Sequence, residues 1–149
     1  MINPNLVQEA LIQTMKGSDA IRSRFGEEIR EDNWMGTNFS YPALRLSLDT
    51  MGPYDRINGP CRPRSSDIQF SALVYTEGPS SNEAGELAGI VANELMGKLI
   101  DYTSSDGKRI IPVGAIDIPA GGIMPPVPDN GERSWRAEVR FNAKIMEGV

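Results

Sequence analysis

SWRAEVRFNAKI, residues 134–145, is the stretch that decides the fold, because its side chains alternate between apolar and polar along its length. This period of two is the pattern of a β-strand with one buried and one solvent-facing side. Two further stretches, YPALRLSLD at 41–49 and DIQFSALV at 67–74, show the same alternation. The three stretches together predict a sheet of antiparallel strands with a single apolar face. The apolar positions of the deciding stretch are Trp135, Ala137, Val139, Phe141, Ala143 and Ile145.

Helical periodicity appears twice. Residues 6–15 carry apolar side chains at helical spacing, and Gly17 is the stop. The start signal is either Asn3 followed by Pro4 or Asn5 with Gln8 three residues on. A shorter helical turn follows from Ser18 to Gly26. The second helix starts at a predicted capping box of Ser80 and Glu83. Its predicted core stripe is Ala84, Leu87, Ala88, Val91, Leu95 and Leu99.

The remaining segments are irregular or weakly patterned. Ile29 lies in a charged stretch that predicts a brief edge strand, and residues 110–118 predict a strand interrupted by Pro112 and Gly114. Residues 52–66 and 120–131 are rich in Gly and Pro and are predicted to be loops. The sequence therefore predicts one α+β domain over residues 1–149. It has a mostly antiparallel sheet of about four to five strands and two main helices packed on one face.

Composition excludes several functional classes. The chain has no His, one Cys, 15 Lys and Arg against 20 Asp and Glu, and a net charge of −5. The lack of His removes His-based acid–base catalysis and His metal sites, and one Cys excludes an intrachain disulfide. A net negative charge opposes binding to nucleic acid or an anionic membrane. No apolar run approaches a membrane span and no export signal is present, which predicts a cytoplasmic location.

No catalytic, cofactor-binding or metal-binding residue is predicted. Cys61 lacks an activating base, and Met96-Gly97-Lys98 lacks the other residues of a phosphate loop. The features that remain point to protein contacts: apolar residues in a loop, an Arg-bearing loop, a glycine strip on the second helix and a Pro-rich loop. The candidate interface residues are Trp34, Met35, Arg56, Arg62, Arg64, Gly85, Gly89, Met124, Pro125 and Pro126.

The order of these segments resembles the tail-terminator, or tail-completion, proteins of long-tailed bacteriophages. The resemblance rests on LVQEALIQTMKGSDAIRSRFG, YPALRLSLD, DIQFSALVYTEGPSSNEAGELAGIVANELMGKL and the closing SWRAEVRFNAKI, which together span nearly the full chain. It is a resemblance of order and pattern rather than of an invariant catalytic motif.

The resemblance implies a virion protein of the tail and neck that assembles in the host cytoplasm. Such a subunit forms a homo-hexameric ring that caps the tail tube, ends tube polymerisation and meets the head-side connector or stopper protein. DNA passes through the lumen without specific binding, which an acidic conduit permits. The family has no catalytic residues, no cofactor and no membrane partner.

Two other functions remain open from the sequence. One is another neck component of the phage, such as a head-completion or stopper protein. The other is a small cytosolic α+β module that binds a metabolite, which requires a concave pocket with convergent polar groups. An enzyme is less favoured, because its site would have to be built from carboxylates, Arg, Tyr or Ser alone.

Overall fold

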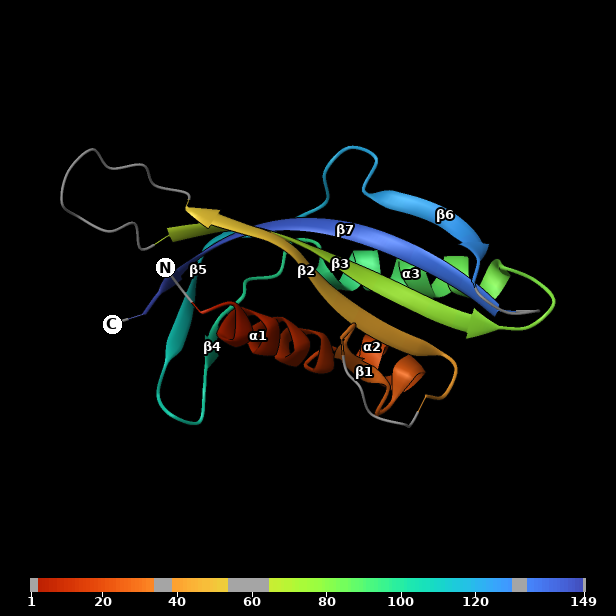
Figure 1. Cartoon of the computed structure of the whole chain (residues 1–149), viewed down its shortest axis with the longest axis horizontal. Helices are drawn as coiled ribbons and strands as arrows, with labels where there is room; N and C mark the ends of the chain where they lie inside the picture. The colour runs from red at the N-terminus through yellow and green to blue at the C-terminus, as the bar shows by residue number, and fades with distance from the viewer. Residues whose placement is uncertain (1–2, 34–38, 54–64, 130–133, 149) are drawn as a thin grey trace.

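A strongly curved sheet forms the body of the protein in a computed structural model that describes residues 3–33, 39–53, 65–129 and 134–148 (Figure 1). The helices are α1 (Pro4–Lys16), α2 (Asp19–Phe25) and α3 (Asn82–Leu95). The strands are β1 (Ile29–Glu31), β2 (Ala43–Pro53), β3 (Ser65–Glu77), β4 (Tyr102–Thr103), β5 (Arg109–Asp117), β6 (Ile123–Pro128) and β7 (Ser134–Glu147).

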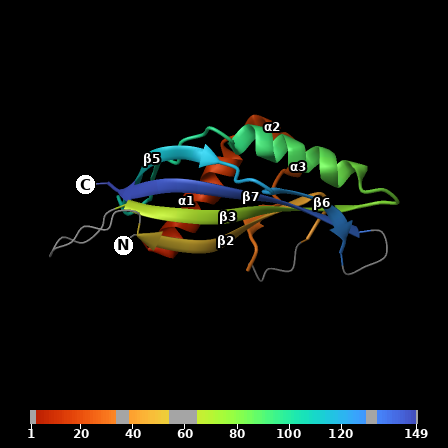
Figure 2. The same cartoon turned by 90° about the horizontal axis from the view of Figure 1, so that it is seen from above.

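The strands run in the order β1-β2-β3-β7-β5-β4, and β6 pairs with β7 beside β5. The last strand in the chain, β7, therefore lies in the middle of the sheet, with β3 on one side and β5 and β6 on the other. β1 is parallel to β2, whereas the other pairs are antiparallel. Figure 2 shows β2, β3 and β7 side by side with the helices against them.

The expected sheet of four to five mostly antiparallel strands with two helices is wrong. The sheet is mixed, has seven strands, curves into a half-barrel and carries three helices. The brief edge strand predicted at Ile29 is confirmed as β1. The difference arises from short or disguised elements. β4 contains two residues, too few for an alternation to show, and β6 contains three prolines.

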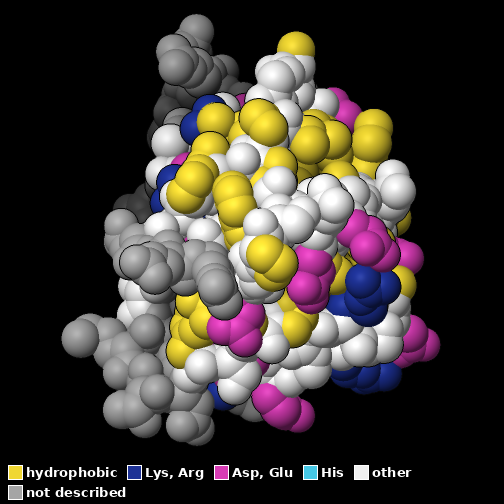
Figure 3. All heavy atoms as spheres, turned by 90° about the vertical axis from the view of Figure 1, so that its right-hand side faces the viewer, with side chains coloured by type: hydrophobic (Ala, Val, Ile, Leu, Met, Phe, Trp, Pro, Cys, Tyr) yellow, Lys and Arg dark blue, Asp and Glu magenta, His cyan; other side chains and the backbone are white. Residues whose placement is uncertain are grey.

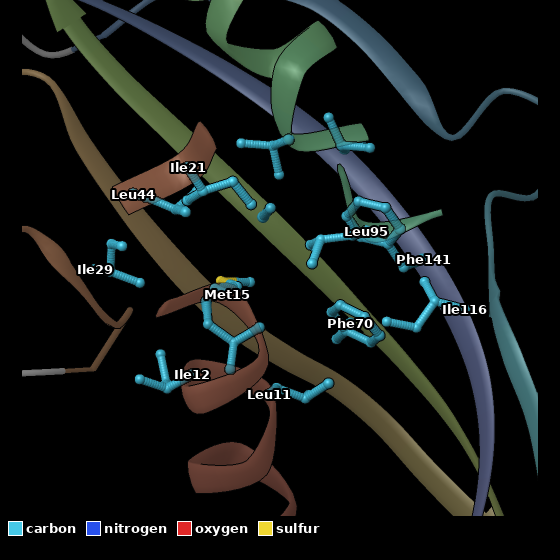
Figure 4. Packing of buried hydrophobic residues seen from close by; sticks show 14 of the residues in the cluster. Leu11, Ile12, Met15, Ile21, Ile29, Leu44, Phe70, Leu95, Ile116 and Phe141 are labelled. Atoms are coloured by element: carbon cyan, nitrogen blue, oxygen red, sulfur yellow. The ribbon is translucent and has the colours of Figure 1, made fainter. Parts of the chain in front are cut away.

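One hydrophobic core joins the sheet to all three helices. The alternation predicted for β7 is confirmed from Ala137 to Ile145, because its apolar side chains are buried there and the intervening ones are more exposed. Phe70 of β3 and Phe141 of β7 stack with ring centroids 5.1 Å apart. Figure 4 shows these two rings beside Leu95 and Ile116, with Met15 and other α1 residues at the opposite side of the cluster.

The two N-terminal helices start where their capping residues predict. The Asn3 side chain accepts a hydrogen bond from the Asn5 N–H at 2.9 Å, and Ser18 does the same for the Ile21 N–H at 3.4 Å. Each bond satisfies a backbone donor that the first turn leaves unpaired.

The predicted capping box of α3 is wrong. The N-cap is Ser81, whose side chain makes no capping bond, and the Ser80 hydroxyl instead accepts from the Asn82 N–H at 3.2 Å. The helix ends at Leu95, so Leu99 is not part of its core stripe and is 60% exposed.

The two predicted loops have different outcomes. Residues 120–131 are not a loop throughout, because they contain β6. β2 extends to Pro53 and β3 begins at Ser65, while residues 54–64 lie outside the described part of the chain. The strand with interruptions at Pro112 and Gly114 is confirmed as β5, whose register against β7 shifts at both places.

Candidate functional site

An exposed apolar strip lies on β6. The side chains of Ile123, Met124 and Val127, here called the β6 patch, are 57%, 38% and 42% exposed. Figure 3 shows hydrophobic side chains gathered over this end of the molecule, above a group of acidic ones. Met124 and Val127 pair in register with Glu138 and Arg136 and so share the outer face of the sheet, whereas Ile123 pairs with Val139 on the other face. Exposed apolar side chains gathered on a small protein mark a surface for contact with another molecule.

Prolines close the free side of β6 to further strands. Pro125, Pro126 and Pro128 have no backbone N–H, and β6 pairs with β7 through Ile123, Met124, Val127 and Pro128. Pro on an edge strand prevents another strand from adding to it. A partner at β6 must therefore be held by side-chain packing rather than by a continued sheet.

The turn before β6 fixes its position. The Arg140 N–H donates to the Gly122 carbonyl at 2.7 Å, which anchors the start of β6 to β7. A Cβ atom at Gly122 would lie 2.8 Å from the Ile118 Cγ2 atom and 2.9 Å from the Pro119 carbonyl oxygen. Only glycine allows this approach without displacement of the turn.

Two of the predicted interface residues meet inside the chain. A Cβ atom at Gly85 of α3 would lie 3.7 Å from the Pro126 side chain, so α3 and β6 pack together there. A Cβ atom at Gly89 would meet nothing within 4 Å among the described residues. Within the described part of the chain, the glycine strip therefore packs against a neighbour at Gly85 but not at Gly89.

We expect alanine substitutions at two glycines to have opposite effects. Gly89→Ala should raise the free energy of unfolding by about 0.5–1 kcal/mol, because it relieves the cost of glycine in a helix and meets no neighbour. Gly122→Ala should lower it by about 1–3 kcal/mol through the crowded turn. Urea denaturation of both variants tests this, and equal shifts of the same sign would contradict the described packing.

The other predicted interface residues divide into two groups. Met124 and Pro125 are exposed and Pro126 is half-buried, all on β6, as an interface role requires. Trp34, Met35, Arg56, Arg62 and Arg64 lie outside the described residues. Ile123 and Val127 were missed in the sequence, because prolines obscure the strand on which they lie.

An aromatic cluster on the outer face of the sheet was also missed. Phe39 packs edge-to-face against Tyr41 and Tyr75, with ring centroids 5.1 and 5.9 Å away. Tyr75 pairs in register with Arg136 of β7, which in turn pairs with Val127 of β6. The cluster and the β6 patch therefore lie at the same end of the sheet.

Burial raises the pKa of the Tyr75 phenol above its ordinary value. The carboxylates of Asp32 and Asp129 raise this pKa further, whereas the charge and hydrogen bond of Arg136 oppose them. Tyr75 thus stays neutral as a hydrogen-bonding group over the physiological pH range.

A buried ion pair lies beneath the aromatic cluster. The Arg45 Nη2 atom donates to the Glu28 carboxylate at 2.9 Å, and Nη1 donates to the Glu28 carbonyl oxygen at 2.9 Å. The Arg45 guanidinium also lies 4.8 Å from the centroid of the Phe39 ring. The alternation had placed Arg45 on a solvent-facing side, but it is 4% exposed. The pair joins the residue just before β1 to β2 and lies against the Phe39 ring of the cluster.

The hollows on the described surface are lined by few side chains that could catalyse a reaction or bind a metal ion. One is lined by Asn5, Gln8, Glu9, Ile12 and Glu31 beside α1 and β1. Within the described residues, no three Cys, Asp or Glu side chains are placed to hold a metal ion. None of the helices in that part of the chain combines the length and apolar character needed to cross a membrane.

Comparisons with known proteins give the fold alone. No protein-family model and no curated protein matches the chain. A solved structure is similar over 96% of this chain and 96% of its own, with a TM-score of 0.53 and 14% sequence identity. A known protein thus shares the overall arrangement along nearly the whole chain.

Proposed function

We propose that the protein is a subunit of the ring that caps a bacteriophage tail tube. The ring ends tube polymerisation and joins the tail to the head-side connector or stopper protein. In this proposal the partners are further copies in a hexamer, the tail-tube protein and the connector, and DNA passes through the lumen without specific binding. The protein resides in the host cytoplasm during assembly and then in the virion.

The β6 patch is the observation that carries the proposal. A structural subunit needs a rigid surface that excludes water on contact and cannot extend indefinitely as a sheet. β6 offers exposed apolar side chains on a strand whose free side is blocked by proline. The resemblance of the whole chain to tail-terminator proteins is the reason for proposing that this assembly is a ring on the tail tube.

The proposal is tested by the mass of the purified protein over a concentration range, together with negative-stain images of the same samples. A sixfold ring with a central hole, or a cap on added tail tubes, would support it. A compact dimer with no larger species, and no cap on added tubes, would contradict it. A ring that binds the connector but never the tube would favour another neck component.

Acidic substitution of the β6 patch should weaken assembly and leave the fold intact. Met124→Asp with Val127→Asp removes exposed apolar contacts, so we expect the free energy of unfolding to change by no more than about 0.5 kcal/mol. Assembly should weaken at least about tenfold, because buried apolar anchors dominate interface energies. Analytical ultracentrifugation and urea denaturation measure the two effects.

Val113→Asp is the matched control. Val113 is 44% exposed and lies on β5, away from the β6 patch. Its substitution also replaces an exposed apolar side chain by a carboxylate. Assembly by this variant should equal that of the wild type. Equal weakening of assembly in the control and in the double variant would contradict a specific role of β6 in the interface.

A further inference from the structure

The outer edge of β2 is paired along only part of its length. β1 pairs with Leu44–Leu46, where the Leu44 N–H donates to the Glu28 carbonyl at 2.8 Å and the Asp32 N–H donates to the Leu46 carbonyl at 2.7 Å. Backbone groups alternate in direction along a strand, so those of Leu48 point to this same side. After the register shift between Leu48 and Thr50, the alternation gives Met51 the same orientation.

No strand of the described chain pairs with this side of β2 beyond Leu46. The stretch from Leu48 to Pro53, here called the free edge, thus presents the N–H and C=O groups of Leu48 and Met51 without a strand partner among the described residues. Unlike β6, it has a proline only at its last residue. An unpaired strand edge of this kind is a template for an extended peptide.

Acidic hollows lie where β1 stops and the free edge begins. One is lined by Gln8, Asp32, Asn33, Leu46, Ser47 and Leu48, and its neighbour is the hollow with Glu9 and Glu31. Gln8 lines both. The lining residues include three carboxylates, from Glu9, Glu31 and Asp32, and no Lys or Arg. This charge is complementary to a cationic segment.

Apolar side chains accompany the free edge. Leu48 and Met51 pack against the core but remain partly exposed. An extended segment beside them can cover both side chains while its backbone bonds to β2. The edge, the hollows and these two side chains therefore define one surface with apolar, polar and anionic parts.

We propose that the free edge of β2 binds an extended, Lys- or Arg-bearing segment of a partner protein, which adds to the sheet as a strand. The segment continues the line of β1. Its backbone pairs with Leu48 and Met51, its apolar side chains cover those two residues, and its cations near β1 face the acidic hollows. This inference is independent of the ring, since it concerns the opposite edge of the sheet from β6.

The test uses the intact protein with three synthetic peptides of alternating residues, KVKVKVK, EVEVEVE and KVKPKVK. Fluorescence anisotropy gives affinities, and amide NMR shifts locate the contact. We expect KVKVKVK to bind and to shift the amides of Leu48 and Met51. The acidic peptide should bind at least about tenfold more weakly because of the carboxylates. The proline peptide should lose about tenfold because it lacks a central N–H.

Two variants of the protein test the same points. Met51→Pro removes an N–H that faces away from β3, so the sheet should form while KVKVKVK binding falls about tenfold. Glu31→Gln with Asp32→Asn should weaken KVKVKVK about fivefold. Glu77→Gln with Glu83→Gln, a change of two exposed carboxylates elsewhere, should leave binding unchanged. The proline peptide keeps the test valid if Met51→Pro does not fold.

Several outcomes would overturn the proposal. Equal affinity for the acidic and basic peptides would show that the carboxylates do not contribute to binding. If KVKPKVK bound as tightly as KVKVKVK, or if the amide NMR shifts lay away from the free edge, the peptide would not bind by strand addition. Self-association that Met51→Pro abolishes, without KVKVKVK binding, would assign the edge to a second copy of the chain. The ring is measured separately by mass, so its failure is distinguishable from these results.

Discussion

Val139→Asp unfolds the protein in our expectation. Val139 is fully buried near the centre of β7, where it pairs with Ala72 of β3 and Ile123 of β6. A carboxylate there has no cation to pair with on the apolar face, and its burial costs several kcal/mol. Because a domain of this kind is stable by only about 5–15 kcal/mol, the variant should lose most or all of its cooperative transition. Circular dichroism during urea denaturation measures this.

Arg140→Asp provides the comparison for that variant. Arg140 is the next residue of β7, faces the opposite side of the sheet and is exposed, with an ion pair to Glu138. Loss of this exposed pair should cost no more than about 1 kcal/mol. Melting of Val139→Asp like the wild type, or equal damage from both variants, would show that the buried face of β7 is assigned wrongly.

Arg45→Met is expected to have the second largest effect. The substitution leaves the buried Glu28 carboxylate without its cation, because the side chains of Arg45 and Glu28 are only 5% and 11% exposed. Breaking a buried pair in this way typically costs about 3–5 kcal/mol. Thermal and urea denaturation should show the loss as a lower midpoint with an unchanged slope.

The double variant Arg45→Met with Glu28→Gln separates charge from packing. It removes both charges, so we expect much of the lost stability to return, and a double-mutant cycle gives the coupling energy. Phe39→Ala should cost less than Arg45→Met, since it removes a ring contact but leaves the ion pair intact. Independent, additive effects at Arg45 and Glu28 would mean that the pair is not coupled in solution.

The main strands and helices could be predicted because each carries its own period. The apolar residues of β3 and β7 alternate over many residues, and α1 has a complete stripe between a start signal and a stop signal. The number of strands could not be predicted, because β4 and β6 carry no alternation of their own. β4 has only two residues, and β6 is interrupted by three prolines, so each is recognised only by its pairing with the strand that follows it.

The candidate site was only partly predictable for a related reason. Met124, Pro125 and Pro126 were assigned to a contact surface from composition, but the strand that presents them was taken as a loop. The Arg45–Glu28 pair joins residues 17 positions apart and contradicts the local alternation. Sequence period describes which side of a strand a residue faces, whereas it does not reveal what covers that side.

The position of β7 in the sheet has a consequence for how the chain folds during its synthesis. β3 leaves the ribosome long before residues 134–147, yet β7 is the neighbour that it requires on one side. Until β7 arrives, β3 lacks its partner on that side, β5 has only the two-residue β4 beside it, and β6 has no described strand to join. The nascent chain thus remains vulnerable to aggregation until the last strand emerges, and then gains the pairings of β7 with β3, β5 and β6 together. Any premature stop before β7 leaves a chain without a sheet centre.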